Sequence, residues 1–366
     1  MKRLNNFHRV VVAPLGGTIA CVPTAGGGVR PSPDPTFMRG VLDLSLRPID
    51  DLPEAELLLS EGVSSAELDI PRLAALLEQL GGHIDAGASG VVVTTGTDAL
   101  EEVAFVLDLL WDRDEPLIVV GAMRHGALPG SDGPANLRDG LRVAAHPHAR
   151  GQGVLVAMGG EIHYAWQVRK SHSGALAAFN SAVSGPAGSV QKDTVRMTSM
   201  SVIDRPLFKL SPPTATAPVA LVQSALGDDG RILSLTTAAG YRGLVIEALG
   251  GGSVPSAWVT GLKQLVRAVP VVYSPRTFAG PTLRSTYGST GGELDLRRMG
   301  IIPSGLLDSL KSRLLLQLLL TTEADAGARE RAFAMFDQPR TTGTRREIFA
   351  AHERTQDSPF PRVESH

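Results

Sequence analysis

The first half of the chain alternates short β-branched runs with helical hydrophobic patterns. Helices are predicted from about 98 to 110 and from 134 to about 145, because apolar residues recur there at helical spacing. Strands are predicted at 10–12, 91–93, 117–120 and 154–156. These strand runs are apolar at every position, which is typical of strands buried on both faces. The pattern therefore predicts an α/β fold with a mostly parallel sheet and helices on both faces.

A second α/β unit is predicted after this pattern weakens between about 188 and 217, where Pro212-Pro213 forms a stiff connection. Further strands are expected at 219–222, 244–246 and 269–273, and a closing helix from about 305 to 320. We therefore predict a large N-terminal domain at 1–190, a linker at 191–217, a smaller C-terminal α/β domain at 218–330 and a tail at 331–366.

Composition narrows the class of protein. A chain of 366 residues is long enough for two domains, and a net charge of -2 argues against nucleic acid or an anionic membrane as the main partner. The sequence has no run of 18 apolar residues, so no transmembrane helix is expected. Cys21 is the only cysteine, which excludes an intrachain disulfide and a thiolate metal cage. The N-terminus resembles an export signal, but Pro14 and two glycines break its apolar run. We expect a cytoplasmic protein.

Two threonines follow two of the predicted strands. Thr18 comes after Gly16-Gly17, and Thr97 comes after Gly96 and before Asp98. Loops at the carboxyl ends of parallel strands place side chains over the ligand crevice of an open sheet. A hydroxyl with bare backbone beside it is suited to acyl transfer, since the backbone N–H groups can hold an oxyanion. Each threonine also has a structural interpretation, as a turn residue or, for Thr97-Asp98, as a capped helix start that leads to Glu101.

Lys170 is a third candidate, in the segment Gln167-Val168-Arg169-Lys170. A lysine in a polar loop is ordinarily a solvated surface residue. It gains a chemical role only if the fold brings it close to Thr97 and Asp98, where it would influence proton transfer at the threonine hydroxyl.

The order of these motifs resembles that of the bacterial-type L-asparaginase/glutaminase family. The resemblance spans roughly residues 8 to 322. It rests on Lys170 together with four motifs: 16–20 (GGTIA), 95–102 (TGTDALEE), 120–124 (VGAMR) and 132–137 (DGPANL).

The resemblance implies a role for each matched residue in the hydrolysis of L-asparagine to L-aspartate and ammonia. Thr18 would be the nucleophile that forms an acyl-enzyme, and Thr97, Asp98 and Lys170 would activate it or the hydrolytic water. Asp98 would also bind the substrate α-ammonium. The substrate-binding set implied by the resemblance is Gly17, Ser64, Ser65, Gly96 and Asp98, with Ser64 at the α-carboxylate and backbone near Gly17 and Gly96 at the oxyanion.

The resemblance also implies a homodimer or homotetramer with sites at subunit interfaces, and it implies no metal and no organic cofactor. The Gly- and Pro-rich segment 21–39 is expected to be a lid, although it lacks the tyrosine that many members carry there. Ser65 stands where many members have glutamine, and Thr95 where many have histidine. These departures leave open an alternative substrate, namely glutamine, D-asparagine or another amide. A non-catalytic protein that binds a small ligand is a further alternative.

Overall fold

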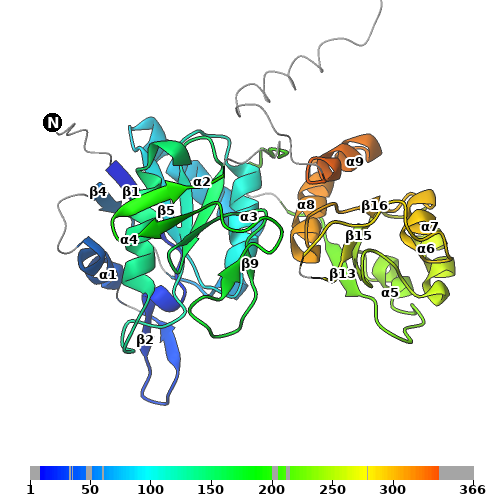
Figure 1. Ribbon diagram of the computed structural model, residues 1–366, viewed down its shortest axis with the longest axis horizontal. Helices are drawn as coiled ribbons and strands as arrows, with labels where there is room; N and C mark the ends of the chain where they lie inside the picture. The colour runs from blue at the N-terminus through cyan, green and yellow to red at the C-terminus, as the bar shows by residue number, and fades with distance from the viewer. Residues whose placement is uncertain are drawn as a thin grey trace, which may run out of the picture.

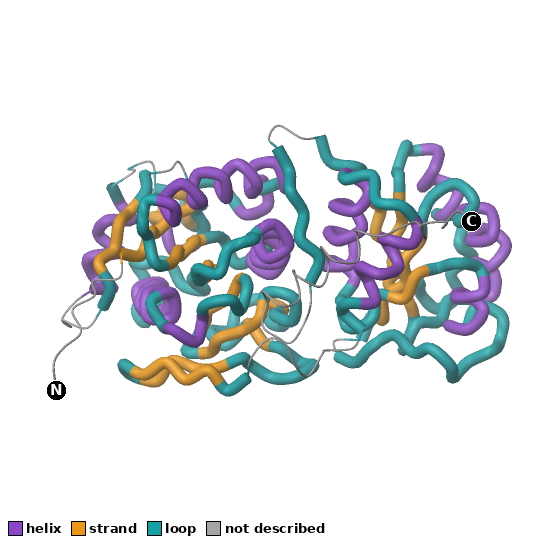
Figure 2. Tube along the Cα trace, turned by 90° about the horizontal axis from the view of Figure 1, so that it is seen from above, coloured by secondary structure: helices purple, strands orange, loops and turns teal. Residues whose placement is uncertain are grey.

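The computed structural model describes residues 9–32, 34, 36–46, 52–59, 62–199, 205–211, 215–277 and 279–337. Within these ranges the chain forms two α/β domains that lie next to each other (Figures 1 and 2). The described helices are all too short or too polar to cross a membrane. The predicted Pro212-Pro213 connection and the tail beyond residue 337 lie outside the described residues.

The N-terminal domain is built on an eight-stranded sheet with the order β12-β11-β8-β7-β6-β5-β1-β4. The strands β4, β1, β5, β6 and β7 are parallel, and the antiparallel strands β8, β11 and β12 extend one edge. The predicted mostly parallel sheet is therefore confirmed. The strand bounds are β1 Arg9–Pro14, β4 Glu54–Leu57, β5 Gly90–Thr94, β6 Leu117–Val120, β7 Val154–Met158, β8 Glu161–Tyr164, β11 Gly188–Gln191 and β12 Thr194–Met197.

Helices cover both faces of this sheet, as its apolar strands require. The pairs α1 and α4 pack together on one face, and α2 and α3 pack together on the other. The valines of β1 and β5 between these layers are completely buried, which explains why neither strand alternates apolar with polar residues. The helix bounds are α1 Phe37–Leu46, α2 Ile70–Asp85, α3 Leu100–Leu110 and α4 Gly133–Ala144.

The strand order reverses near one edge of the sheet, at β1. From β1 the chain first builds β4 on one side, and it then returns to the other side of β1 to build β5, β6 and β7. Ligands bind in open parallel sheets at such a switch point, because the loops that leave the two neighbouring strands run in opposite directions there and open a crevice. The fold therefore points to the carboxyl ends of β1 and β5.

The C-terminal domain has a four-stranded parallel sheet, in the order β13-β14-β15-β16. Helix α8 packs against this sheet and also against α3, so it lies between the two domains (Figure 1). Trp258 and Leu262 cover the other face together with α5 and α7. The bounds are β13 Val219–Gln223, β14 Gly243–Ala248, β15 Val271–Pro275, β16 Ile302–Pro303, α5 Leu233–Ala238, α6 Val259–Leu265, α7 Glu293–Arg298, α8 Ser309–Thr321 and α9 Ala326–Ala334.

Short elements complete the chain. Two small ribbons pair β2 Cys21–Pro23 with β3 Val29–Pro31, and β9 Arg169–Lys170 with β10 Phe179–Asn180. The 3₁₀ helices are η1 Thr18–Ala20, η2 Ser65–Glu67, η3 Pro147–Ala149 and η4 Ser256–Trp258.

The domain bounds expected from the sequence stay a prediction, and two observations bear on them. The strand β12 belongs to the N-terminal sheet although it falls in the predicted linker at 191–217. Phe333 and Phe336, in the predicted tail, are fully buried, and the Phe336 ring lies against Phe105 and Trp166. Aromatic residues alone do not tell a tail from a segment that packs back on a core, because only the partner surface distinguishes the two.

Candidate active site

The loops that leave β1 and β5 are in direct contact. The backbone N–H of Leu15 donates to the carbonyl of Thr94 at 2.8 Å, and the N–H of Val63 donates to the carbonyl of Leu15 at 2.9 Å. Gly16 and Val63 also form an isolated parallel bridge. Three segments that are distant in the sequence, around residues 16, 63 and 95, therefore meet at the switch point of the sheet.

Gly17 makes the closest of these approaches. Its φ angle is +86°, and a Cβ atom built on it would lie only 2.3 Å from the amide nitrogen of Gly96. A side chain would therefore be strained by the backbone angle and would also collide with the β5 loop. Because Gly17 precedes Thr18 and Gly96 precedes Thr97, this contact brings the segments of the two predicted threonines together.

Lys170, Thr97 and Asp98 form a hydrogen-bonded cluster. The Lys170 Nζ atom donates to Thr97 Oγ1 at 3.0 Å and to Asp98 Oδ1 at 2.7 Å. Thr97 is buried and the Lys170 side chain is 14% exposed, whereas the Asp98 side chain is 85% exposed. Lys170 is therefore not a solvated surface residue; β9 aims it at the start of α3.

The structure corrects the predicted helix cap. The N-cap residue of α3 is Ala99, and no side chain caps this helix. Asp98 lies one residue too early for that role, and its carboxylate accepts from Lys170 instead. The Asp98–Glu101 spacing matched a capping box, but the tertiary contact with β9 captures the side chain.

The predicted serines lie at the same junction. Ser64 is exposed at the start of η2, where its hydroxyl accepts from the N–H of Ala66 at 3.4 Å. Ser65 is buried, and its Oγ atom lies 2.7 Å from the position that a Cβ on Gly96 would occupy. Both serines are therefore beside the loop that carries Thr97. Thr18 begins η1 and is half-buried.

Glu101, expected from the sequence only as part of a capped helix start, is a further residue of the site. Its buried carboxylate accepts from the backbone N–H of Lys170 at 3.2 Å. Burial raises the pKa of Glu101, and the nearby Lys311 and Arg169 oppose that effect. Its place in the first turn of α3 gives no sequence signal beyond helix capping, because the contact with β9 spans 69 residues.

The motif at 132–137 has a structural role in the loop after β6. The Asp132 carboxylate accepts from the N–H groups of Met123 and Arg124 at 2.9 and 2.8 Å. Buried Asn136 donates to the carbonyl of Gly121 at 3.0 Å and accepts from the N–H of Gly159 at 3.0 Å. These bonds fix Gly121, where a Cβ atom would lie 3.2 Å from the Thr97 methyl group. The motif thus supports the wall behind Thr97.

The β2–β3 ribbon projects from the domain immediately after Thr18 (Figure 1). A cavity of about 790 Å³ lies between this ribbon, α1 and the loop at 126–135. Cys21 lines it, and the Cys21 thiol donates to the carbonyl of Gly17 at 3.2 Å. Burial raises the pKa of this thiol, which leaves it protonated and makes it a packing residue.

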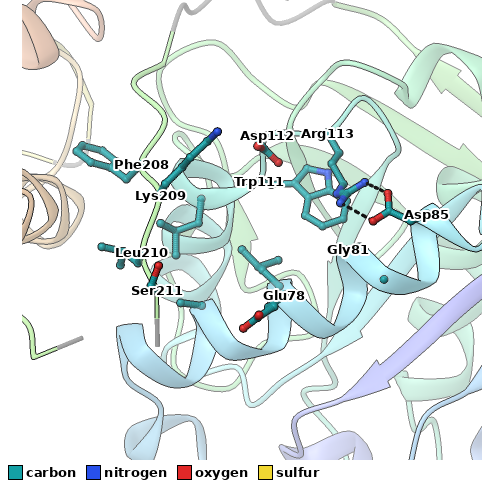
Figure 3. A pocket seen from close by; sticks show the side chains of 14 residues that line it. Glu78, Gly81, Asp85, Trp111, Asp112, Arg113, Phe208, Lys209, Leu210 and Ser211 are labelled. Carbon is teal, nitrogen blue, oxygen red and sulfur yellow. Dashed lines mark hydrogen bonds and ion pairs between the residues drawn. The ribbon is translucent and has the colours of Figure 1, made fainter. Parts of the chain in front are cut away.

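Figure 3 shows a second cavity, of about 580 Å³. It is formed by α2, the end of α3 and the segment at 208–211, and the ion pair between Arg113 and Asp85 lies on its wall. The predicted site residues do not line it. The described residues hold no group of three or more His, Cys, Asp or Glu side chains arranged for a metal ion.

Comparison with known proteins identifies the family. The chain matches the family model "Asparaginase, N-terminal" over residues 9–202 and the model "Glutaminase/Asparaginase C-terminal domain" over residues 218–333. These matches cover most of the chain and follow the two domains of the structure. The chain belongs to the asparaginase family.

Individual relatives agree with this assignment. The chain is 36% identical over 345 residues to a probable L-asparaginase of Deinococcus radiodurans, covering 90% of this chain and 98% of the relative. It is 33% identical to a probable periplasmic L-asparaginase of Haemophilus influenzae, covering 68% of this chain and 70% of that protein. The crystal structure of a probable cytoplasmic L-asparaginase from Campylobacter jejuni superposes with a TM-score of 0.78 at 26% identity, covering 89% and 99% of the two chains.

Proposed function

We propose that this protein hydrolyses L-asparagine to L-aspartate and ammonia, with Thr18 as the nucleophile. The observation that carries the proposal is the contact of Gly17 with Gly96, which joins the Thr18 segment to the cluster of Lys170, Thr97 and Asp98. The relatives from Deinococcus and Campylobacter are both described as probable L-asparaginases, which supports L-asparagine as the substrate.

The chemistry proceeds in two halves. The Thr18 oxygen attacks the side-chain amide carbon, its proton passes through the neighbouring polar groups to the leaving nitrogen, and ammonia departs from an acyl-enzyme. Water then attacks the ester carbon, and its proton returns to the Thr18 oxygen as L-aspartate leaves. Lys170 contacts Thr97 and Asp98, so it is placed to organise these proton transfers. Backbone N–H groups beside Gly17 and Gly96 face the developing oxyanion.

The exposed groups at the junction fit the α-amino acid end of the substrate. Asp98 combines a carboxylate held by Lys170 with 85% side-chain exposure, which suits the α-ammonium. The Ser64 hydroxyl, exposed at η2, suits the α-carboxylate. The β2–β3 ribbon beside Thr18 is the candidate lid, since Cβ atoms built on its tip glycines would meet nothing of the described chain within 4 Å.

The test is ammonia release from L-asparagine by the Thr18→Ala variant. We expect kcat to fall by at least about 10⁴-fold with an unchanged circular dichroism spectrum, because the covalent route is lost. The matched variant Thr18→Ser keeps a hydroxyl and should keep part of the activity. Ammonia release at the wild-type rate by Thr18→Ala would refute the nucleophile.

The same assay separates the alternatives. A panel of L-asparagine, D-asparagine, L-glutamine and small primary amides identifies the amide that is turned over. An amide other than L-asparagine would fit if Ser65 and the glycine-rich loop have reshaped the pocket. Calorimetric binding of asparagine without ammonia release would instead identify a ligand-binding protein. The proposal includes a cytoplasmic location and a homodimer or homotetramer; sedimentation measurements of the full chain would test the assembly.

A further inference from the structure

Two buried charged side chains, Lys311 and Glu101, and the partly buried Asp308 connect the C-terminal domain to the segment that carries Lys170. Lys311, on α8, has no exposed surface. Its Nζ atom donates to Asp308 Oδ2 at 2.7 Å and to the backbone carbonyl of Val168 at 2.8 Å, and it lies 3.7 Å from Glu101 Oε2. We call Lys311, Asp308 and Glu101 the α8–α3 charge cluster.

The α8–α3 charge cluster holds the backbone at and just before the Lys170 position. Lys311 binds the carbonyl two residues before Lys170, and Glu101 accepts from the N–H of Lys170 itself. The Lys170 side chain then reaches Thr97 and Asp98, which lie in the loop before the helix of Glu101. The start of α3 and the loop before it therefore supply one anchor of the Lys170 backbone, at Glu101, and both partners of the Lys170 side chain.

The backbone at Lys170 needs such an anchor. The strand β9 has only two residues, and its partner in the small ribbon is β10 alone. A ladder this short contributes little rigidity by itself. The Lys170–Thr97 contact in turn depends on the backbone position, because a long side chain loses its geometry when its own Cα moves.

Burial of the charged Lys311 side chain disfavours the folded state. Taking a lysine out of water costs several kcal/mol unless it is paired well, and an apolar side chain of similar volume would pack there at no such cost. Leu314 and Leu315, on the same helix, are buried as apolar residues of this kind. The ammonium at position 311 therefore serves the polar contacts that it makes, and one of these holds the carbonyl of Val168, two residues before Lys170.

We propose that the α8–α3 charge cluster positions Lys170 for catalysis, so that docking of the C-terminal domain on α3 completes the active site. Lys311, Asp308 and Glu101 are positioning residues, and they act through the Lys170 backbone. The inference rests on the proposed function, because it assigns Lys170 a part in the reaction.

The primary test is the Lys311→Met variant, which keeps the length of the side chain and removes its charge. We expect kcat for asparagine to fall at least about tenfold, because a displacement of about 1 Å in a catalytic group has effects of this size or larger. KM should change less than kcat, and the pH profile of kcat should shift as the surroundings of Lys170 change. A crystal structure should show Lys170 Nζ outside hydrogen-bond distance of Thr97 Oγ1.

The matched control is Arg313→Met on the same helix. Arg313 Nε donates to the carbonyl of Val219 at 3.2 Å, within the C-terminal domain. This variant should lower the melting temperature and leave kcat and the pH profile as in the wild type. A folded Lys311→Met protein with wild-type kcat and pH profile would overturn the proposal.

A second pair of variants applies if Lys311→Met does not fold. Glu101→Gln keeps a side-chain oxygen that accepts from the Lys170 N–H, whereas Glu101→Ala removes it. We expect Glu101→Ala to lower kcat at least about tenfold, and Glu101→Gln, which keeps the acceptor but loses the charge facing Lys311, to lower kcat less. Equal kcat values for the two folded variants would contradict the role of the cluster.

A failure of the proposed reaction can be distinguished from a failure of the positioning role. A wild-type protein that releases ammonia from no amide of the panel would end the assignment of the reaction. The crystal structures of the Lys311 and Glu101 variants would still decide the positioning role: a displaced Lys170 supports it, and an unmoved Lys170 excludes it.

Discussion

The Asp98 side chain is 85% exposed although it accepts a hydrogen bond from Lys170 at 2.7 Å. Ion pairs at such exposed positions contribute little, since water screens them. The carboxylate is therefore available to a second cation at small cost. Recognition of a substrate ammonium requires a carboxylate of this kind, which is held in place and is still exposed.

The first residue-scale prediction concerns Asp98→Ala. We expect KM for asparagine to rise about 10- to 100-fold, because a hydrogen bond to a charged group is worth roughly 1.5–3 kcal/mol. We expect kcat to fall as well, since Lys170 loses a partner. Steady-state ammonia kinetics measure both, with Asp98→Asn as the comparison that keeps one acceptor. Unchanged constants for Asp98→Ala would remove this residue from the site.

The second residue-scale prediction concerns His163, which is fully buried on β8. Burial lowers the pKa of His163 to about 4, below its usual value in an unfolded chain. The unfolded state therefore binds more protons between about pH 6.5 and pH 4, so stability is complete above this window and declines as the pH falls through it.

Urea unfolding at pH 7.5 and pH 4.5 tests this effect. His163→Gln should reduce the loss of unfolding free energy between the two pH values by about 2 kcal/mol relative to the wild type. His148→Gln, at an exposed position on η3, is the control and should follow the wild type. Identical pH dependence in the wild type and His163→Gln would contradict the assignment.

At the scale of elements, the site is made by the way two strand–loop units meet. The strands β1 and β5 are neighbours in the sheet, with Pro14 in register with Thr94. Their loops can approach only because Gly17 has a φ of +86° and no side chain. The 3₁₀ turn η1 then starts at Thr18. The local geometry at one glycine thus decides where the proposed nucleophile lies.

The element-scale prediction compares Gly17→Ala with Gly27→Ala. Both glycines have nearly the same φ, +86° and +85°, but a Cβ on Gly27 meets nothing within 4 Å. Gly27→Ala should therefore cost only about 1 kcal/mol for the backbone angle. Gly17→Ala should cost at least about 3 kcal/mol and abolish turnover, since the β1 and β5 loops must separate. Denaturant unfolding and ammonia assays measure both, and equal effects would argue against the steric account.

On the scale of the whole molecule, the two domains share a packed interface. Helix α8 contacts both α3 and the C-terminal sheet, and residues of both domains belong to one hydrophobic cluster. Phe336, after α9, lies with its ring 5.9 Å from that of Phe105 and 6.5 Å from that of Trp166. The end of the described chain therefore packs against the N-terminal domain.

The whole-molecule prediction concerns Phe336→Ala. Removing this fully buried ring should cost about 3–5 kcal/mol of unfolding free energy, since a cavity remains at the interface. Leu226→Ala, at a fully exposed position of the C-terminal domain, is the control and should stay within about 0.5 kcal/mol. Thermal and denaturant unfolding measure the difference. A Phe336→Ala protein as stable as the control would show that this segment does not hold the domains together.

Local sequence patterns predict the layers of the fold and the candidates for its chemistry. Apolar strands without alternation require cover on both faces, so the parallel sheet and its helices follow from local composition. The motifs that contain Thr18, Thr97 and Asp98 were visible because glycine-rich strand ends have a distinctive local sequence. The family resemblance gave Lys170 a role and added Ser64 and Ser65 as candidates.

Which of these residues meet, and which contacts hold them, depends on long-range packing. Lys170 contacts Asp98 across 72 positions of the chain, and Lys311 binds the carbonyl of Val168 across 143. No local pattern encodes such pairs, because they depend on how helices and domains pack. For the same reason Asp98 looked like a helix cap in the sequence, and Lys311 gave no signal there at all.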